Sequence, residues 1–158
     1  MDMQRRDVLK KSGGVSLLTL LVAAGWMTPG EASAQAAWNA AAFDTKTMDD
    51  TMKALGGGTP VASKDITFLQ TPDIAENGAV VPIGISSAIP KTTAIAILVE
   101  KNPNMLVAMF ELPAGTEPSI STRVKMGQSS NVYALVKADG KYYTAVKEIK
   151  VTLGGCGG

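Results

Sequence analysis

The chain contains no histidine and only one cysteine. Without histidine it lacks the commonest general base and metal ligand, and it can form neither a Ser-His nor a Cys-His catalytic pair. A single cysteine cannot form an internal disulfide; in an oxidising compartment it either bonds to another chain or works as a thiol. These absences argue against an enzyme. We therefore expect no catalytic residues, no metal and no cofactor bound to the chain.

Residues 1–34 have the pattern of an export signal. The segment 4–10 carries paired arginines followed by leucine and lysine, as a twin-arginine signal does. The apolar stretch 15–25 is too short to span about 30 Å of hydrocarbon, which argues against the alternative of a membrane anchor. The Ala-Ser-Ala at 32–34 fits the small-x-small cleavage rule. We therefore expect a periplasmic protein that begins at Gln35 and is exported already folded, with a folded partner as the reason for this route.

The mature chain is predicted to be electrically neutral. Removal of residues 1–34 takes away four of the 15 basic and three of the 14 acidic residues, which leaves 11 of each in 124 residues. This balance gives no support to nucleic-acid binding, which needs a basic surface. We interpret the carboxylates beside turns as solvated charges or caps: Asp65, Asp73, Glu76, Glu111 and Glu117. The methionines at strand spacing, Met105, Met109 and Met126, are interpreted as core residues and not as copper ligands.

Apolar residues near the start of the mature chain recur at helical spacing. Met48, Met52 and Leu55 lie at positions i, i+4 and i+7, which predicts one apolar stripe. Thr47 is placed to cap the start of this helix, and the three glycines at 56–58 are placed to end it. We expect the helix to pack against the domain that follows or against a partner.

From residue 64 onward, short β-branched runs alternate with turn residues. Asp139-Gly140 predicts a two-residue hairpin turn, and a shift of the apolar phase near Val146 and Lys147 predicts a bulge. The fold expected from this pattern is mainly β: an immunoglobulin-like antiparallel β-sandwich of about seven strands with an N-terminal helix and a flexible C-terminal arm. The predicted strands are 66–70, 79–87, 93–100, 105–111, 120–126, 131–138 and 142–153. The expected divisions are a twin-arginine signal peptide (1–34), an N-terminal helical segment (35–63), the sandwich (64–153) and the arm (154–158).

The single cysteine, Cys156, lies third from the end of the chain among four glycines: Gly154, Gly155, Gly157 and Gly158. Glycine contributes no packing and has the most conformational freedom, so the sequence predicts an arm with a thiol near its tip. Leu153 to Cys156 can extend roughly 10 to 13 Å. The thiol has no cationic neighbour in sequence, so we expect a pKa near the reference value of about 8.5. Such a thiol is a poor catalyst but a suitable carrier, because partner enzymes can supply the activation.

The chain end is open to four other interpretations. A disordered end with an incidental cysteine would leave a β-sandwich binding module that carries nothing. A thiol-exchange protein is disfavoured because no second, resolving cysteine is present. A carrier of the Gly-Gly thiocarboxylate type is disfavoured because its activation needs ATP, which the periplasm lacks. Prenylation is excluded because it needs cysteine fourth from the end.

The chain end, Gly-Gly-Cys-Gly-Gly after a Val-Thr strand, resembles the end of the SoxY family, the sulfur-carrier subunits of the periplasmic thiosulfate-oxidising (Sox) system. Three internal segments are similar to motifs of the same family and follow in the same order. They are 72–82 (PDIAENGAVVP), Asn102-Pro103 and 123–128 (RVKMGQ). The resemblance covers essentially the whole mature chain and the export signal.

The resemblance implies a covalent carrier of sulfur intermediates and not an enzyme. Cys156 would be the attachment site, first for a thiosulfonate and then for a persulfide, and the four glycines would give the swinging arm its slim profile. The implied partner is a SoxZ-type immunoglobulin-like subunit that forms a heterodimer and is exported with this chain. The arm would then visit a haem-bearing ligase, a dimanganese hydrolase and, where present, a sulfane dehydrogenase. The cofactors would belong to those enzymes.

Overall fold

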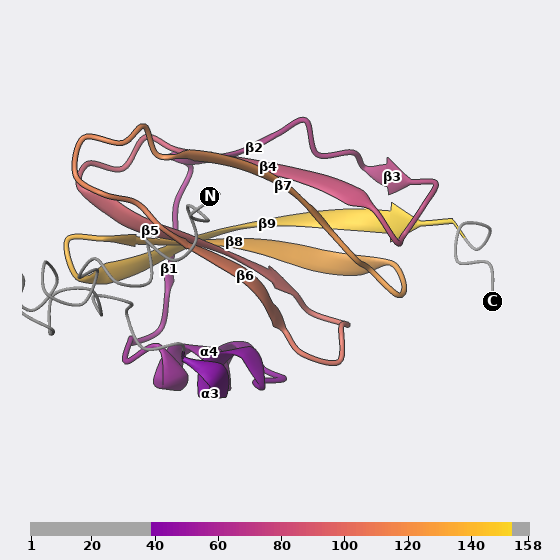
Figure 1. The fold of residues 1–158 in the computed structure, drawn as a ribbon, viewed down its shortest axis with the longest axis horizontal. Coiled ribbons are helices and arrows are strands. Elements are labelled where there is room, and N and C mark those ends of the chain that lie inside the picture. Colours follow the sequence, from indigo (N-terminus) through magenta and orange to yellow (C-terminus); the bar gives the residue numbers. More distant parts are fainter. Residues whose placement is uncertain (1–38, 153–158) are drawn as a thin grey trace, which may run out of the picture. The chain divides into compact units, whose positions relative to one another are not determined.

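The computed structural model describes residues 39–152 (Figure 1). The predicted export signal (1–34) and carrier arm (154–158) lie outside these residues.

Two β-sheets stack face to face, and two short helices lie under the larger sheet. The helices are α3 (Ala40–Phe43) and α4 (Met48–Ala54). The larger sheet has the order β1 (Val61–Ala62), β9 (Lys141–Val151), β8 (Ser130–Ala138), β5 (Thr92–Val99) and β6 (Leu106–Glu111), and β3 (Ile74–Ala75) also pairs with β9. The smaller sheet has the order β2 (Ile66–Leu69), β4 (Val81–Ser87) and β7 (Ser119–Val124).

The hydrophobic core lies between the two sheets, because alternate residues of each central strand point inward. Fully buried side chains come from both layers, namely Ile83 and Ile85 of β4, Ile95 and Ile97 of β5, and Val132 and Val136 of β8. Burying one such side chain contributes about 1.5–3 kcal/mol. All seven predicted strands are present, all pairs among them are antiparallel, and the predicted immunoglobulin-like sandwich is confirmed.

A second hydrophobic cluster joins the helices to the outer face of the larger sheet. Met52 of α4 packs with Leu98 and Leu135, and the hydroxyl of Tyr142 donates to the carbonyl of Leu55 at 3.2 Å. Thr47 caps α4 as predicted, since its Oγ1 accepts from the Asp50 amide at 3.1 Å. The chain before this cap forms the separate helix α3. Among residues 39–152, neither helix is long and apolar enough to cross a membrane.

The predicted hairpin turn is confirmed, but the predicted bulge in β9 is wrong. Asp139 and Gly140 both have positive φ, 50° and 74°, as a tight hairpin turn requires. Strand β9 then pairs with β8 in unbroken register from Lys141 to Ile149. The apolar phase shifts because Lys147 occupies an inward position at the edge of the sandwich, while Val146 is 57% exposed on the outer face. The register shifts lie in other strands: Thr93 of β5 is the extra residue opposite β8, and Val107 of β6 is the extra residue opposite β5.

Candidate functional site

The end of β9 is held from both sides. On one side, the amide of Val151 donates to the hydroxyl of Ser129 at 2.9 Å. On the other side, the amides of Lys150 and Thr152 donate to the carbonyls of Asp73 and Ala75, at 2.9 and 3.1 Å. Strand β3 therefore pairs in parallel with the last residues of β9. The backbone is fixed up to Thr152, four residues before Cys156.

Strand β3 reaches this position because the chain changes sheets just before it. Strand β2 belongs to the smaller sheet, and the crossing segment 70–73 leads to β3 in the larger one. Lys147 secures the crossing: its Nζ lies 3.0 Å from the Asp73 carboxylate and donates to the carbonyl of Thr71. The Asp73 side chain is 86% exposed, so the ion pair itself contributes little to stability. The hydrogen bond to the Thr71 carbonyl orients the Lys147 side chain toward the crossing segment.

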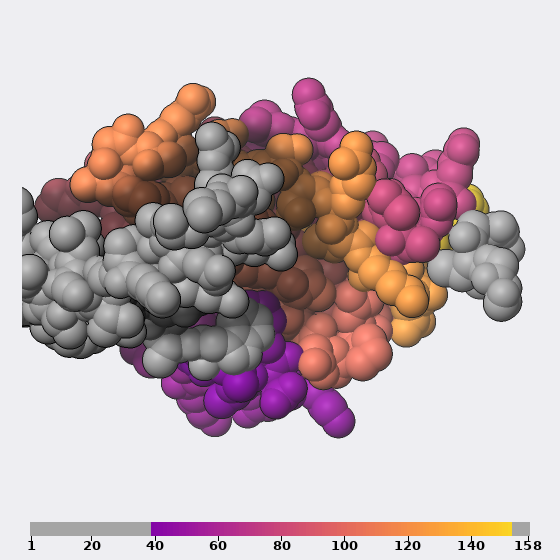
Figure 2. Space-filling view, viewed as in Figure 1, coloured from indigo at the N-terminus to yellow at the C-terminus, as the bar shows by residue number. Residues whose placement is uncertain are grey.

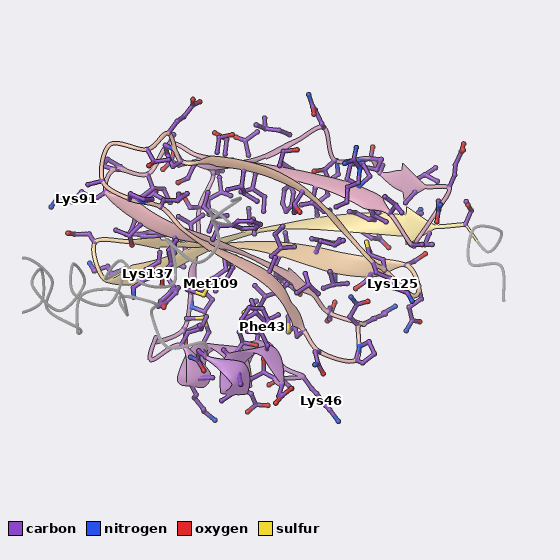
Figure 3. All side chains as sticks on the ribbon, viewed as in Figure 1. Phe43, Lys46, Lys91, Met109, Lys125 and Lys137 are labelled. Carbon is purple, nitrogen blue, oxygen red and sulfur yellow. The ribbon has the colours of Figure 1, made fainter. Side chains whose placement is uncertain are left out.

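Three loops surround the end of β9, and we call this region the exit end. The loops are 76–80 between β3 and β4, 100–105 between β5 and β6, and 125–129 between β7 and β8. Figure 2 shows them against one another, in magenta, salmon and orange, and Figure 3 labels Lys125 among them. The Asn102 side chain donates to the carbonyl of Lys125 at 2.8 Å, and the Met126 amide donates to the carbonyl of Gly78 at 2.7 Å. The loop 125–129 is thus bonded to both of its neighbours.

The three internal motifs are brought together at the exit end. The motif 72–82 supplies β3 and its following loop, Asn102-Pro103 lies in the second loop, and 123–128 forms most of the third. Segments about 20 to 50 residues apart in the sequence thereby surround the end of β9. The residues predicted to carry sulfur and to form the arm lie outside the described residues: Cys156, Gly154, Gly155, Gly157 and Gly158.

Sequence reasoning missed the residues that hold the end of β9. The sequence pattern gives no role to Ser129, and it predicts a solvated charge at Asp73 and a bulge near Lys147. Their roles depend on which strands are neighbours in the sheets. The periodicity of the sequence does not predict these neighbours. The one available signal was the resemblance of 72–82 and 123–128 to family motifs.

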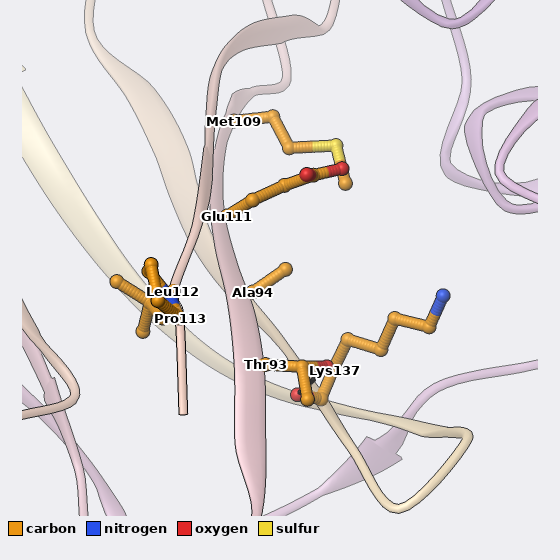
Figure 4. Close-up of a pocket in the computed structure, with 7 residues that line it drawn as sticks. All are labelled: Thr93, Ala94, Met109, Glu111, Leu112, Pro113 and Lys137. Atoms are coloured by element: carbon orange, nitrogen blue, oxygen red, sulfur yellow. Dashed lines mark hydrogen bonds between the residues drawn. The ribbon is translucent and has the colours of Figure 1, made fainter. Parts of the chain in front are cut away.

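Two surface hollows of the described residues lie at the opposite end of the sandwich. One of about 380 Å³ is lined by residues of β5, β6 and β8, including Met109, Glu111 and Lys137 (Figure 4). Another, of about 510 Å³, includes the turn around Lys91. Within residues 39–152 no group of three acidic or cysteine side chains is placed to hold a metal ion. The family motifs therefore lie at the exit end, away from these two hollows.

Comparisons with known proteins agree with the motifs. The family model described as "Sulfur oxidation protein SoxY" matches residues 51–156. Among solved structures, the sulfur carrier protein SoxY from Chlorobium limicola f thiosulfatophilum is 39% identical, with a TM-score of 0.60, and the match covers 66% of this chain and 96% of that one. A superoxide reductase (neelaredoxin) from Ignicoccus hospitalis is 19% identical, with a TM-score of 0.48, over 55% of this chain and 79% of that one. No curated protein sequence matches the chain.

Proposed function

This chain belongs to the SoxY family of sulfur carrier proteins, and we propose that it holds sulfur covalently on the Sγ atom of Cys156 during thiosulfate oxidation. One observation carries the proposal: the family match extends to residue 156, and that residue is the only cysteine of the chain. The bonds of β3 and Ser129 to the end of β9 support it. These hydrogen bonds fix the backbone from which the proposed arm would begin, so the length of the arm would set how far Cys156 can reach.

In the proposed cycle the chain supplies the thiol and its partners supply the activation. The Cys156 thiol loses its proton and forms an S–S bond to the outer sulfur of thiosulfate, and the two electrons released pass to a haem-bearing ligase. Water then cleaves the bond between that sulfur and the sulfonate group. Sulfate and a proton leave, and a persulfide remains on Cys156. The chain is thus a carrier and not a catalyst, and the cofactors belong to the partner enzymes.

The proposed setting is the periplasm, reached through the twin-arginine pathway with residues 1–34 as the signal. The proposed stable partner is a SoxZ-type immunoglobulin-like subunit, exported with this chain as a heterodimer. The dimanganese hydrolase and, where present, a sulfane dehydrogenase would receive the loaded arm in turn. This order of visits agrees with a carrier whose only reactive group lies at the chain end.

The substitution Cys156→Ser tests the attachment site. We expect thiosulfate-dependent electron transfer in a reconstituted system to fall to background, because serine has no sulfur to form the adduct. The melting temperature should not change, since the change lies beyond the last residue of β9. Thr152→Ser, which keeps a hydroxyl at the end of β9, is the matched control and should retain turnover. Sulfur still bound to the Cys156→Ser protein would refute the proposal, and a modification on Gly158 would indicate a thiocarboxylate carrier instead.

A further inference from the structure

Strand β6 is an edge of the larger sheet that no other strand covers among residues 39–152. Edge strands usually carry charges, prolines or bulges that prevent pairing with other chains. Within residues 39–152, the other edges have such features: β7 follows Pro118 and includes Arg123, β2 has only four residues, and β9 is covered at two places by β1 and β3. In β6 the bulge is confined to its start, where Val107 is the extra residue opposite β5. The regularly paired stretch that follows, 108–110, is apolar, and Glu111 is the only charge of the strand.

The backbone of β6 presents free hydrogen-bonding groups along this edge. The Leu112 amide donates to the carbonyl of Thr93 at 2.8 Å, and Phe110 and Ala108 follow in the same phase opposite β5. Because the direction of these groups alternates along a strand, those of Met109 and Glu111 point away from β5. Neither residue has a partner for these groups among residues 39–152. A further β-strand could form hydrogen bonds with these unpaired N–H and C=O groups, which occur at every second residue.

The side chains along this edge are also incompletely covered. Val107 and Phe110 of β6 and Ile120 of β7 pack against the core but are only partly buried. Strands β6 and β7 end their sheets on the same side of the sandwich, since β2, at the other end of the smaller sheet, contacts β9. An added strand would therefore cover a row of apolar side chains as well as pairing with the backbone.

We propose that β6 receives an antiparallel β-strand from the partner subunit, an inference that rests on the proposed heterodimer. The expected strand is apolar and carries a lysine or arginine opposite Glu111, whose side chain is exposed and forms no ion pair within residues 39–152. A second copy of this chain fits less well. Antiparallel pairing of β6 with itself about Met109 would set Glu111 opposite Val107. The hollow beside Met109, Glu111 and Lys137 gives room for one side chain of the added strand (Figure 4).

Amide hydrogen exchange, measured by NMR on the mature chain with and without the purified SoxZ-type subunit, tests this pairing directly. We expect the amides of Met109 and Glu111 to exchange at least about ten-fold more slowly in the complex, because they gain hydrogen bonds. The amides of Ala108 and Phe110 already face β5 and should change much less. A stable complex in which Met109 and Glu111 exchange as fast as in the free chain would overturn the proposal.

The substitution Met109→Pro gives an independent test. Proline removes an outward-facing N–H that is not needed for the sheet, so we expect the fold to persist and the Kd for the subunit to rise at least about ten-fold. Ser121→Pro is the matched control, since it removes the corresponding outward N–H from β7, and its Kd should be unchanged. Equal binding by the two variants would overturn the proposal, as would failure of the unaltered chain to bind the subunit. A dimer of the chain alone that is broken by Met109→Pro would assign β6 to a second copy instead.

Sulfur on Cys156 is measured separately by mass spectrometry. Failure of strand pairing at β6 is therefore distinguishable from failure of the proposed carrier function.

Discussion

At the scale of single residues, Gly84 and Thr71 allow the chain to pass from the smaller sheet to the larger. Gly84 is buried in β4, and a Cβ there would overlap the carbonyl oxygen of Leu69. The Thr71 hydroxyl donates to that carbonyl at 2.9 Å and accepts from the Gly84 amide at 3.1 Å. The Thr71 hydroxyl thus takes the place of the backbone pairing between β2 and β4 at the end of β2. The close approach depends on the absence of a side chain at Gly84.

We expect Gly84→Ala to lower the free energy of unfolding by about 2–3 kcal/mol, because the overlapping atom belongs to backbone and cannot move aside freely. Urea unfolding measures this. Gly127→Ala is the control, since a Cβ at Gly127 would meet nothing within 4 Å, and its effect should stay within about 0.5 kcal/mol. Equal stability of the two variants would show that the Leu69 segment adapts without cost.

At the scale of elements, the long strands could be predicted and the short ones could not. Strand β5 contains a continuous apolar run and is bounded by turn residues, whereas β3 has only two residues and therefore shows no pattern. Its place beside β9 follows only from the change of sheets. The error at Lys147 has a related cause, because its inward position is compensated by contacts with Asp73 and Thr71, which are distant in sequence. The thiol and its glycines could be recognised from the sequence alone, but the residues that hold the end of β9 could not.

We expect Ser129→Ala to loosen the end of β9 without unfolding the sandwich. The substitution removes the acceptor of the Val151 amide, and a lost hydrogen bond of this kind costs about 1 kcal/mol. Amide exchange at Val151 should therefore be about five-fold faster, while exchange in the centre of β8 stays the same. Ser121→Ala, on the exposed face of β7, is the control. Unchanged exchange at Val151 would mean that β3 alone holds this end of the strand.

At the scale of the whole molecule, one end of the sandwich is built around the end of β9. Hydrogen bonds link the three loops of the exit end, and the family motifs contribute to each of them. The two hollows beside Glu111 and Lys91 lie at the other end of the described sandwich. This division agrees with the proposed carrier role, in which sulfur on Cys156 would be presented to partner enzymes.

The most direct test of sulfur attachment is mass spectrometry of the protein purified, without reductant, from cells grown on thiosulfate. Intact mass and C-terminal peptide spectra should show sulfur-containing adducts that map to Cys156 and disappear on treatment with a thiol reductant. A Cys156 thiol that is unmodified in the cell, and still unloaded after incubation with thiosulfate and periplasmic extract, would contradict sulfur carriage by this residue.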